Sequence, residues 1–188
     1  MLSRRFFTLA CVFSLSISSA ANAIDLRGTE FEKAGYKYDI DPVLLYSVAL
    51  AESARSSDEF VGKIAPWPWT LRTNTAFYEN SKEDAQRKLM SIIKKRGDKT
   101  SVDVGLMQVN LKWHSHRVED VSSLLNIETN LEVGAQILSE TIRSAPDDYA
   151  LGVGRYHHWK DQERARKYGS RVLSIYRKIM DFEERNEE

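Results

Sequence analysis

The sequence predicts a mainly α-helical domain with one small β-hairpin. Four segments carry apolar residues at the three- and four-residue spacing of a helix face, and capping residues precede three of them. Between these segments lie two short stretches rich in aromatic and β-branched residues, with the prolines and polar residues that are typical of turns. The fold class is therefore all-α, or α with a minor sheet.

The first residues have the pattern of a secretory signal peptide. Two arginines precede an apolar run, and Ala21 and Ala23 form a small-x-small cleavage site. The run is short and interrupted by serines, so we favour export and cleavage after Ala23 over a retained N-terminal anchor. We therefore expect residues 1–23 to be the signal peptide and residues 24–188 to form a single domain, with no stable membrane span after cleavage.

The remaining composition excludes several classes of protein. Removing the first 23 of the 188 residues leaves 165, enough for one domain with a real core. It also removes Cys11, the only cysteine, so no disulfide framework is expected. Without the two arginines of the signal peptide, 25 Lys and Arg remain against 27 Asp and Glu. This balance gives no electrostatic reason to expect nucleic acid or a membrane surface as partner.

The first two helices have recognisable ends. An aspartate before Pro42 is an N-cap, and the helix is expected to run to about Ser53. Ser81 and Asp84 resemble the capping box of a second helix, which Gly97 ends. Its apolar stripe comprises Ala85, Leu89, Ile92 and Ile93.

Two further helices follow, with short strands between the second and the third. Thr129 and Glu132 form a clearer capping box for the third helix. Its apolar face carries Leu131, Ala135, Leu138 and Ile142. The apolar face of the last helix carries Ala165, Tyr168, Val172, Ile175, Tyr176 and Ile179. Residues 65–80, "APWPWTLRTNTAFYEN", are expected to form a hairpin, and residues 101–110, "SVDVGLMQVN", are β-rich but short.

A carboxylate continues the apolar face of the first helix. Leu45, Val48, Ala49 and Glu52 fall in line because they are separated by three, four and seven residues. Apolar walls favour the neutral form of a carboxylic acid, which suits a general acid near neutral pH. The alternative is that Glu52, in the last turn of the helix, simply reaches solvent.

Three further segments carry groups that suit a sugar. In "GLMQVN", the carboxamides of Gln108 and Asn110 both donate and accept hydrogen bonds, as sugar hydroxyls and N-acetyl groups do. "GRYHHW" includes Tyr156, and "PWPW" holds Trp67 and Trp69 on a stiff loop where flat sugar faces could pack. Each segment also has a structural explanation, either locally satisfied amides or aromatic packing.

Taken together and in this order, these segments resemble the soluble lytic transglycosylase (SLT) family of the lysozyme-like superfamily. Glu52 and Ser53 match the family's catalytic Glu-Ser pair, and "VGLMQVN" is similar to its Gly-Leu-Met-Gln motif at Gly105–Gln108. "IETNLEVGAQIL" resembles its Asn-containing segment ahead of a Gly-Ala helix. "ERARKYGSRVLSIY" resembles its closing helix, with the family's tyrosine at Tyr168. The resemblance extends from about Tyr38 to Ile179.

The resemblance implies a lysozyme-like helical domain with a glycan-binding cleft. It also implies a peptidoglycan lytic transglycosylase, a carbon–oxygen lyase that cleaves the MurNAc-β-1,4-GlcNAc bond and forms 1,6-anhydro-MurNAc. Glu52 would be the catalytic residue, acting as acid and then as base while the substrate's acetamido group supports the developing charge, with no cofactor or metal. The expected substrate-binding residues are Ser53, Gly105, Met107, Gln108, Asn110, Tyr156, His157 and Tyr168, together with Trp67 and Trp69, whose rings suit the packing of flat sugar faces. Asp103, the carboxylate beside the second motif, is interpreted as structural.

The sequence departs from the family pattern in two places. The third motif, usually Ala-Tyr-Asn, reads Arg155-Tyr156-His157, so the role of the Asn does not transfer securely to His157. The 51 residues 54–104 form an enlarged insert between the first and second motifs. Such an insert is similar to those of specialised transglycosylases that accompany conjugation, type IV pilus or secretion machinery. The implied partners are peptidoglycan glycan strands in the periplasm and components of such an apparatus, and not nucleic acid.

Three alternatives remain open at this point. A muramidase similar to goose-type lysozyme would hydrolyse the same bond. A non-catalytic glycan-binding or assembly protein would explain the departures at Arg155 and His157. A metal protein would use the paired histidines, His114 with His116 and His157 with His158, but neither pair has the i, i+4 spacing of helical ligands.

Overall fold

The computed structural model describes residues 24–56, 64–97 and 100–187, so the expected signal peptide, residues 1–23, lies outside the described residues. The helices are α1 Glu30–Lys37, α2 Pro42–Ser53, α3 Lys82–Arg96, α4 Leu111–His114, α5 Ile127–Arg143, α6 Tyr149–Gly154 and α7 Gln162–Glu187. Two short 3₁₀ turns, η2 Ser115–Arg117 and η3 Val121–Leu125, precede α5. The prediction of a mainly helical fold with a small sheet is confirmed.

The sheet is larger than the predicted hairpin. The strands are β1 Ala54–Ser56, β2 Ile64–Pro66, β3 Thr70–Arg72, β4 Ala76–Tyr78, β5 Asp103–Val104 and β6 Val109–Asn110. The expected hairpin is β3–β4, but β5 also pairs with β3, which gives an antiparallel sheet of order β4-β3-β5-β6. The β-rich segment 101–110 therefore extends the sheet that β3 and β4 begin. A separate two-stranded pairing joins β1 to β2.

Two predicted caps form as expected. The Asp41 carboxylate accepts hydrogen bonds from the backbone N–H groups of Val43 and Leu44, and Pro42 takes the first helical position of α2. At the start of α3, Ser81 Oγ accepts from the backbone N–H of Asp84 at 3.1 Å. Both helices therefore begin where capping residues satisfy N–H groups that have no partner within the helix.

The predicted start of α5 is wrong. The helix begins at Ile127, two residues before Thr129, and its N-cap, Asn126, makes no side-chain capping bond. Glu132, the expected second member of the capping box, instead forms an ion pair with Lys37 of α1 at 2.6 Å. The side chain that was expected to close a helix end thus links α5 to α1.

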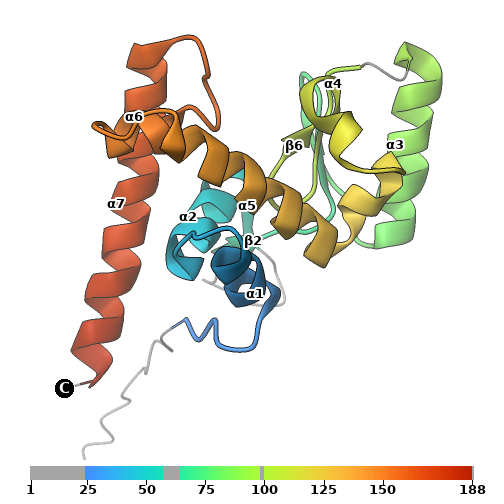
Figure 1. Ribbon diagram of the computed structural model, residues 1–188. Helices are drawn as coiled ribbons and strands as arrows, with labels where there is room; N and C mark the ends of the chain where they lie inside the picture. Colours follow the sequence, from blue (N-terminus) through green and yellow to red (C-terminus); the bar gives the residue numbers. More distant parts are fainter. Residues whose placement is uncertain (1–23, 57–63, 98–99, 188) are drawn as a thin grey trace, which may run out of the picture.

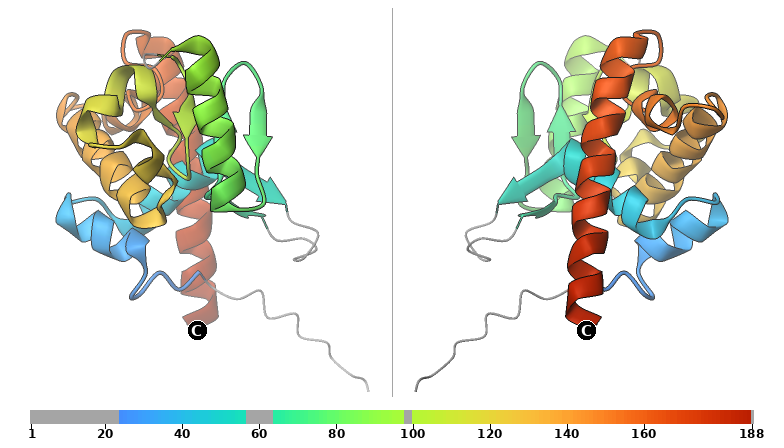
Figure 2. Two further views of the ribbon diagram at one scale, coloured as in Figure 1. Left: turned by 90° about the vertical axis from the view of Figure 1, so that its right-hand side faces the viewer. Right: turned by 90° about the vertical axis from the view of Figure 1, so that its left-hand side faces the viewer.

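Helix α5 crosses the middle of the molecule (Figure 1). In this view, helices α2, α6 and α7 lie on one side of it, and the four-stranded sheet and α3 lie on the other; the turned views show α5 toward one edge of the domain (Figure 2). The long α7 runs along α2 and α6 and extends past the body of the domain. In the part of the chain that the structure describes, no helix has the length and hydropathy needed to cross a membrane.

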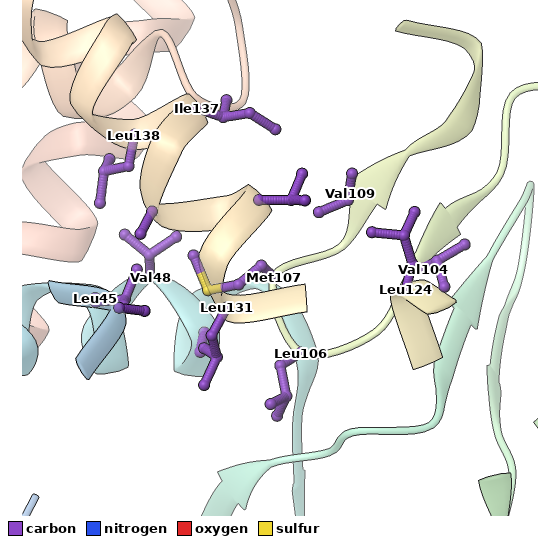
Figure 3. Packing of buried hydrophobic residues seen from close by; sticks show 14 of the residues in the cluster. Leu45, Val48, Val104, Leu106, Met107, Val109, Leu124, Leu131, Ile137 and Leu138 are labelled. Atoms are coloured by element: carbon purple, nitrogen blue, oxygen red, sulfur yellow. The ribbon is translucent and has the colours of Figure 1, made fainter. Parts of the chain in front are cut away.

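Core side chains of α2, α5 and the sheet pack together at the turn between β5 and β6. Figure 3 shows Met107 of this turn beside Leu131 of α5 and between the sheet and Val48 of α2. All three side chains have no exposed surface. The approach of α5 is close, because a Cβ added to Gly134 would lie 2.5 Å from Met107 Cγ. This packing fixes the β5–β6 turn against α2, near the end of the helix that carries Glu52.

Candidate active site

Helix α2 carries Glu52 into the interior. Leu45, Val48 and Ala49 have no exposed surface, and Glu52, on the same face, is 5% exposed. The face that the sequence spacing defines is therefore the buried face, and the alternative in which Glu52 reaches solvent does not hold.

One oxygen of the Glu52 carboxylate is held by two side chains. Tyr168 of α7 donates from Oη to Glu52 Oε1 at 2.5 Å, and Nδ1 of His157 lies 3.5 Å from the same oxygen. The His157 ring stacks on Tyr168, with ring centroids 4.8 Å apart and planes 12° apart. Among the described residues no hydrogen bond reaches Oε2. The second oxygen is thus the one left to exchange a proton with a ligand.

Both tyrosines near Glu52 are neutral donors. Burial raises the pKa of Tyr168 well above its ordinary value, and the charge of Glu52 and its hydrogen bond raise it further. Burial, followed by the charges of Glu52 and Asp103, does the same to the pKa of Tyr156, whose Oη donates to the backbone oxygen of Met107 at 2.7 Å. The pKa of His157 is also raised, because its hydrogen bond to Glu52 outweighs the opposing effect of burial.

The β5–β6 turn is fixed by a buried asparagine. Asn130 of α5 accepts from the backbone N–H of Met107 at 2.7 Å and donates to the backbone oxygens of Val104 and Leu124, each at 2.9 Å. Gly105 has a φ of 81°, and a Cβ there would lie 2.3 Å from Asn130 Nδ2. The glycine is therefore required both by its backbone conformation and by the approach of Asn130.

Two polar residues of the motifs point into this turn. Ser53 is fully buried and donates from Oγ to the backbone oxygen of Leu106 at 2.8 Å, which ties the end of α2 to the turn. Gln108, with a φ of 47°, donates from Nε2 to the backbone oxygens of Thr70 and Gly105. Its buried Oε1 has no hydrogen-bond partner in the described part of the chain. An acceptor is thus left unsatisfied beside the candidate catalytic residue.

The sheet brings three polar side chains into one row. Arg72 on β3 pairs in register with Asp103 on β5, which pairs with Asn110 on β6. Residues directly opposite in an antiparallel sheet share a face, so the three side chains lie on the same side. The adjacent row, which must face the other way, consists of the buried Leu71, Val104 and Val109.

This polar row is linked to Glu52. Arg72 Nη2 donates to the backbone oxygen of Glu52 at 3.0 Å, near the negative end of α2. Asn110 Nδ2 donates to Asp103 Oδ1 at 2.6 Å. The pKa of Asp103 is raised, first by burial and then by the charge of Glu52, against the opposing hydrogen bond from Asn110.

These groups surround an open cavity of about 230 Å³. Its lining includes the predicted site residues Glu52, Gln108, Asn110, Tyr156 and His157. A second cavity of about 570 Å³ shares Tyr156 and His157 with the first and continues past the exposed indoles of Trp113 and Trp159. Together they form a groove, defined by the residues that line either cavity, that passes the Glu52 carboxylate.

The other predicted residues lie outside the lining of the first cavity. Gly105 and Met107 are buried in the turn beneath it, as is Ser53. Tyr168 contacts Glu52 without lining the cavity. Trp67 and Trp69 pack edge to face with ring centroids 5.9 Å apart, on the segment between β2 and β3. That any of these contacts substrate stays a prediction.

Sequence reasoning missed four residues of the groove. Arg72 was not singled out, Asp103 was interpreted as structural, and Trp113 and Trp159 were given no role, although all four line a cavity. The row of Arg72 and Asp103 depends on strand register, which no local pattern reveals. The two indoles had a weaker signal, since each lies beside a histidine in the sequence.

The histidine pairs do not assemble a metal site in the described ranges, where no three His, Cys, Asp or Glu side chains gather to hold an ion. His114 Nδ1 accepts from Arg117 Nε at 3.3 Å. Burial and the nearby charges of Arg117 and His116 lower the pKa of His114 to about 4. His157 is engaged with Glu52 and Tyr168 instead.

Comparison with known families identifies the family of this chain. The family profile described as "Transglycosylase SLT domain" matches residues 29–171, most of the chain. Searches of curated proteins and of solved structures returned no match. This domain indicates activity of the lytic transglycosylase type on peptidoglycan. The chain therefore belongs to the SLT transglycosylase family, and its fold is the lysozyme-like fold of that family.

Proposed function

We propose that the protein is a peptidoglycan lytic transglycosylase that cleaves the MurNAc-β-1,4-GlcNAc bond and leaves a 1,6-anhydro-MurNAc end. The observation that carries the proposal is the environment of Glu52. Its carboxylate lines a groove, is 5% exposed, and is held through Oε1 by the phenol of Tyr168. A buried acid with one fixed oxygen and one free oxygen suits proton transfer to a bound ligand.

The reaction has two steps on this arrangement. In the first, Glu52 gives its proton to the bridging oxygen, the bond from that oxygen to the anomeric carbon breaks, and the acetamido oxygen attacks the same carbon. In the second, the C6 hydroxyl attacks the anomeric carbon, the acetamido group is released, and Glu52 takes the hydroxyl proton. Glu52 returns to its starting state and no water is consumed.

The neighbours of Glu52 support both steps. Tyr168 remains a donor at working pH, so it stabilises the carboxylate that exists between the two proton transfers. Its fixed bond to Oε1 leaves Oε2 as the oxygen that gives and regains the proton. Gln108 Oε1 supplies an acceptor for a donor group of the substrate.

The test is Glu52→Gln, which keeps the shape of the side chain and removes the transferable proton. We expect the release of soluble fragments from purified peptidoglycan to fall by about a thousandfold or more. Thermal unfolding should show that the variant remains folded. Glu128→Gln, at an exposed position in the first turn of α5, is the matched control and should keep full activity. A fully active Glu52→Gln variant would rule out the assignment.

A muramidase is the second candidate, and Asp103 is the observation that favours it. A second carboxylate in the cavity of Glu52 could activate water, as in glycosidases that use two carboxyl groups. Mass spectrometry of the products separates the two reactions, because hydrolysis leaves free reducing ends and transglycosylation leaves anhydro ends.

We also propose that the protein is exported to the periplasm and remodels the cell wall locally for an envelope-spanning apparatus. The support is the signal-peptide pattern of residues 1–23 and the long insert at residues 54–104, which supplies β1–β4, α3 and Asp103. Cell fractionation with sequencing of the mature N-terminus tests export. Deletion of the gene with measurement of pilus, conjugation or secretion activity tests the apparatus.

A further inference from the structure

The cavity of Glu52 contains a second carboxylate that the proposed mechanism does not use. Asp103 lies in the sheet row between Arg72 and Asn110 and lines the same cavity as Glu52. Its Oδ1 accepts from Asn110 Nδ2 at 2.6 Å. Within the described ranges, no donor reaches its Oδ2 and no cation forms an ion pair with it.

Asp103 is not the cap of the neighbouring helix. That role belongs to Asn110, whose Oδ1 accepts from the backbone N–H of Lys112 at the start of α4 at 3.1 Å. The amide of Asn110 thus uses its oxygen for the helix and its nitrogen for Asp103 and for Ser101 Oγ, at 3.0 Å. Asp103 is therefore held through one carboxylate oxygen, as Glu52 is, and its other oxygen is left to accept a hydrogen bond from a ligand.

The charged groups around Asp103 come from three other elements. Glu52 of α2 disfavours its charge, while Arg72 of β3 and His157 after α6 favour it. Arg72 donates a hydrogen bond to the backbone oxygen of Glu52 and none to Asp103. Its buried Nε has no hydrogen-bond partner in the described chain. A carboxylate flanked by a guanidinium and an imidazole but bonded to neither remains available to a ligand.

We propose that Asp103 accepts the N–H of the substrate's 2-acetamido group and thereby orients that group for attack on the anomeric carbon. The inference rests on the proposed function. As the acetamido oxygen bonds to the anomeric carbon, positive charge spreads over the N–C–O unit and the N–H becomes a stronger donor. A hydrogen bond to an anionic acceptor then strengthens in the transition state. Asp103 takes no proton, so the balance of the two steps is unchanged.

The first test is Asp103→Asn, assayed on soluble glycan strands. An interaction that strengthens in the transition state lowers kcat more than it changes KM. We expect kcat to fall by about tenfold to a hundredfold and KM to change by less than about twofold. Ser101→Ala, which removes the other acceptor of the Asn110 amide outside the cavity lining, is the control and should leave both constants unchanged.

The second test measures binding without turnover. The probes are a thiazoline analogue of the cyclised acetamido intermediate, measured at a pH at which its ring nitrogen is protonated and carries the N–H, and the uncyclised GlcNAc-MurNAc disaccharide. Asp103→Asn should lose affinity for the thiazoline by about the same factor as kcat and keep its affinity for the disaccharide within about twofold. Asp103→Ser, which removes the carboxylate without placing an amide beside Asn110, is the second variant if thermal unfolding shows that Asn disturbs the sheet.

Three results would overturn the inference. Unchanged kcat and thiazoline affinity in both variants would remove any role for the carboxylate. A change from reducing ends to anhydro ends in Asp103→Asn would make Asp103 a base that activates water. An equal loss in Ser101→Ala would assign the effect to the position of Asn110. If the wild-type protein cleaved no peptidoglycan, the proposed function would fail, but the binding measurement would still report on Asp103.

Discussion

The two walls of the cavity are built in different ways. The helix wall comprises Glu52, Tyr156 and His157, and Tyr168 supports it by its bond to Glu52. The strand wall comprises Arg72, Asp103, Gln108 and Asn110. In the helix wall, the side chains bond to one another or to the backbone and leave Glu52 Oε2 for proton transfer, whereas the strand wall keeps Arg72 Nε and Gln108 Oε1 without partners in the described chain. This difference suggests a division of work, in which one wall is organised for proton transfer and the other is left to bind the sugar.

The largest loss of stability should come from disturbing the β5–β6 turn, which connects the two walls. Gly105→Ala places a Cβ 2.3 Å from Asn130 Nδ2 at a φ of 81°. Both the strain and the clash act on the buried turn that carries Gln108. We expect the free energy of unfolding, measured by urea titration, to fall by about 3 kcal/mol, with loss of activity.

Gly97→Ala is the matched control for this prediction. Gly97 ends α3 with a φ of 89°, but a Cβ there would meet no atom within 4 Å. Only the strain of a φ of 89° with a ψ of 163° remains, so the loss should be smaller, about 1–2 kcal/mol. Equal losses in the two variants would show that Asn130 does not clamp the turn as described.

The next effect tests the helix wall alone. Tyr168→Phe removes the donor to Glu52 Oε1 and keeps the ring that stacks on His157. With the carboxylate form less stabilised and its orientation less fixed, kcat should fall by about tenfold to a hundredfold at unchanged fold. Tyr149→Phe, on an exposed tyrosine of α6, should have no effect. A Tyr168→Phe variant with wild-type kcat would show that this hydrogen bond does not contribute to the reaction.

The smallest effect should appear as a pH dependence of stability. The pKa of His157 is raised in the folded protein, chiefly by its hydrogen bond to Glu52. A raised folded-state pKa adds stability that is fully present below the unfolded value and is lost as the pH rises through the folded value. His157→Asn should therefore lower Tm more at about pH 6 than at about pH 9. His158→Asn is the control and should not show this pH dependence. If His157→Asn lowered Tm by the same amount at both pH values, the proposed pairing of His157 with Glu52 would be contradicted.

The helix wall could largely be predicted from the sequence. The cap at Asp41 and Pro42 defines where α2 begins, and the spacing from Leu45 places Glu52 on the buried face. Both signals lie within the helix itself, so they do not depend on contacts with distant parts of the chain. Tyr168 was found only because its helix resembles the closing helix of the family, and its bond to Glu52 joins residues 116 positions apart.

The strand wall could not be predicted in the same way. Strands of two or three residues are too short to show alternation, so the row of Arg72 and Asp103 becomes visible only when β3 pairs with β5. The predicted capping box at Thr129 failed for a related reason. The helix begins at Ile127, two residues earlier, and Glu132 pairs with a lysine of α1, a contact that depends on tertiary packing.

The central claim is that Glu52 serves as acid and then as base, with the substrate's own hydroxyl as nucleophile. The most direct measurement is digestion of purified peptidoglycan in ¹⁸O-labelled water, followed by mass spectrometry of the released fragments. The account predicts 1,6-anhydro-MurNAc ends without ¹⁸O, and no such products from Glu52→Gln. Reducing MurNAc ends that carry one ¹⁸O would contradict it and identify the protein as a hydrolase.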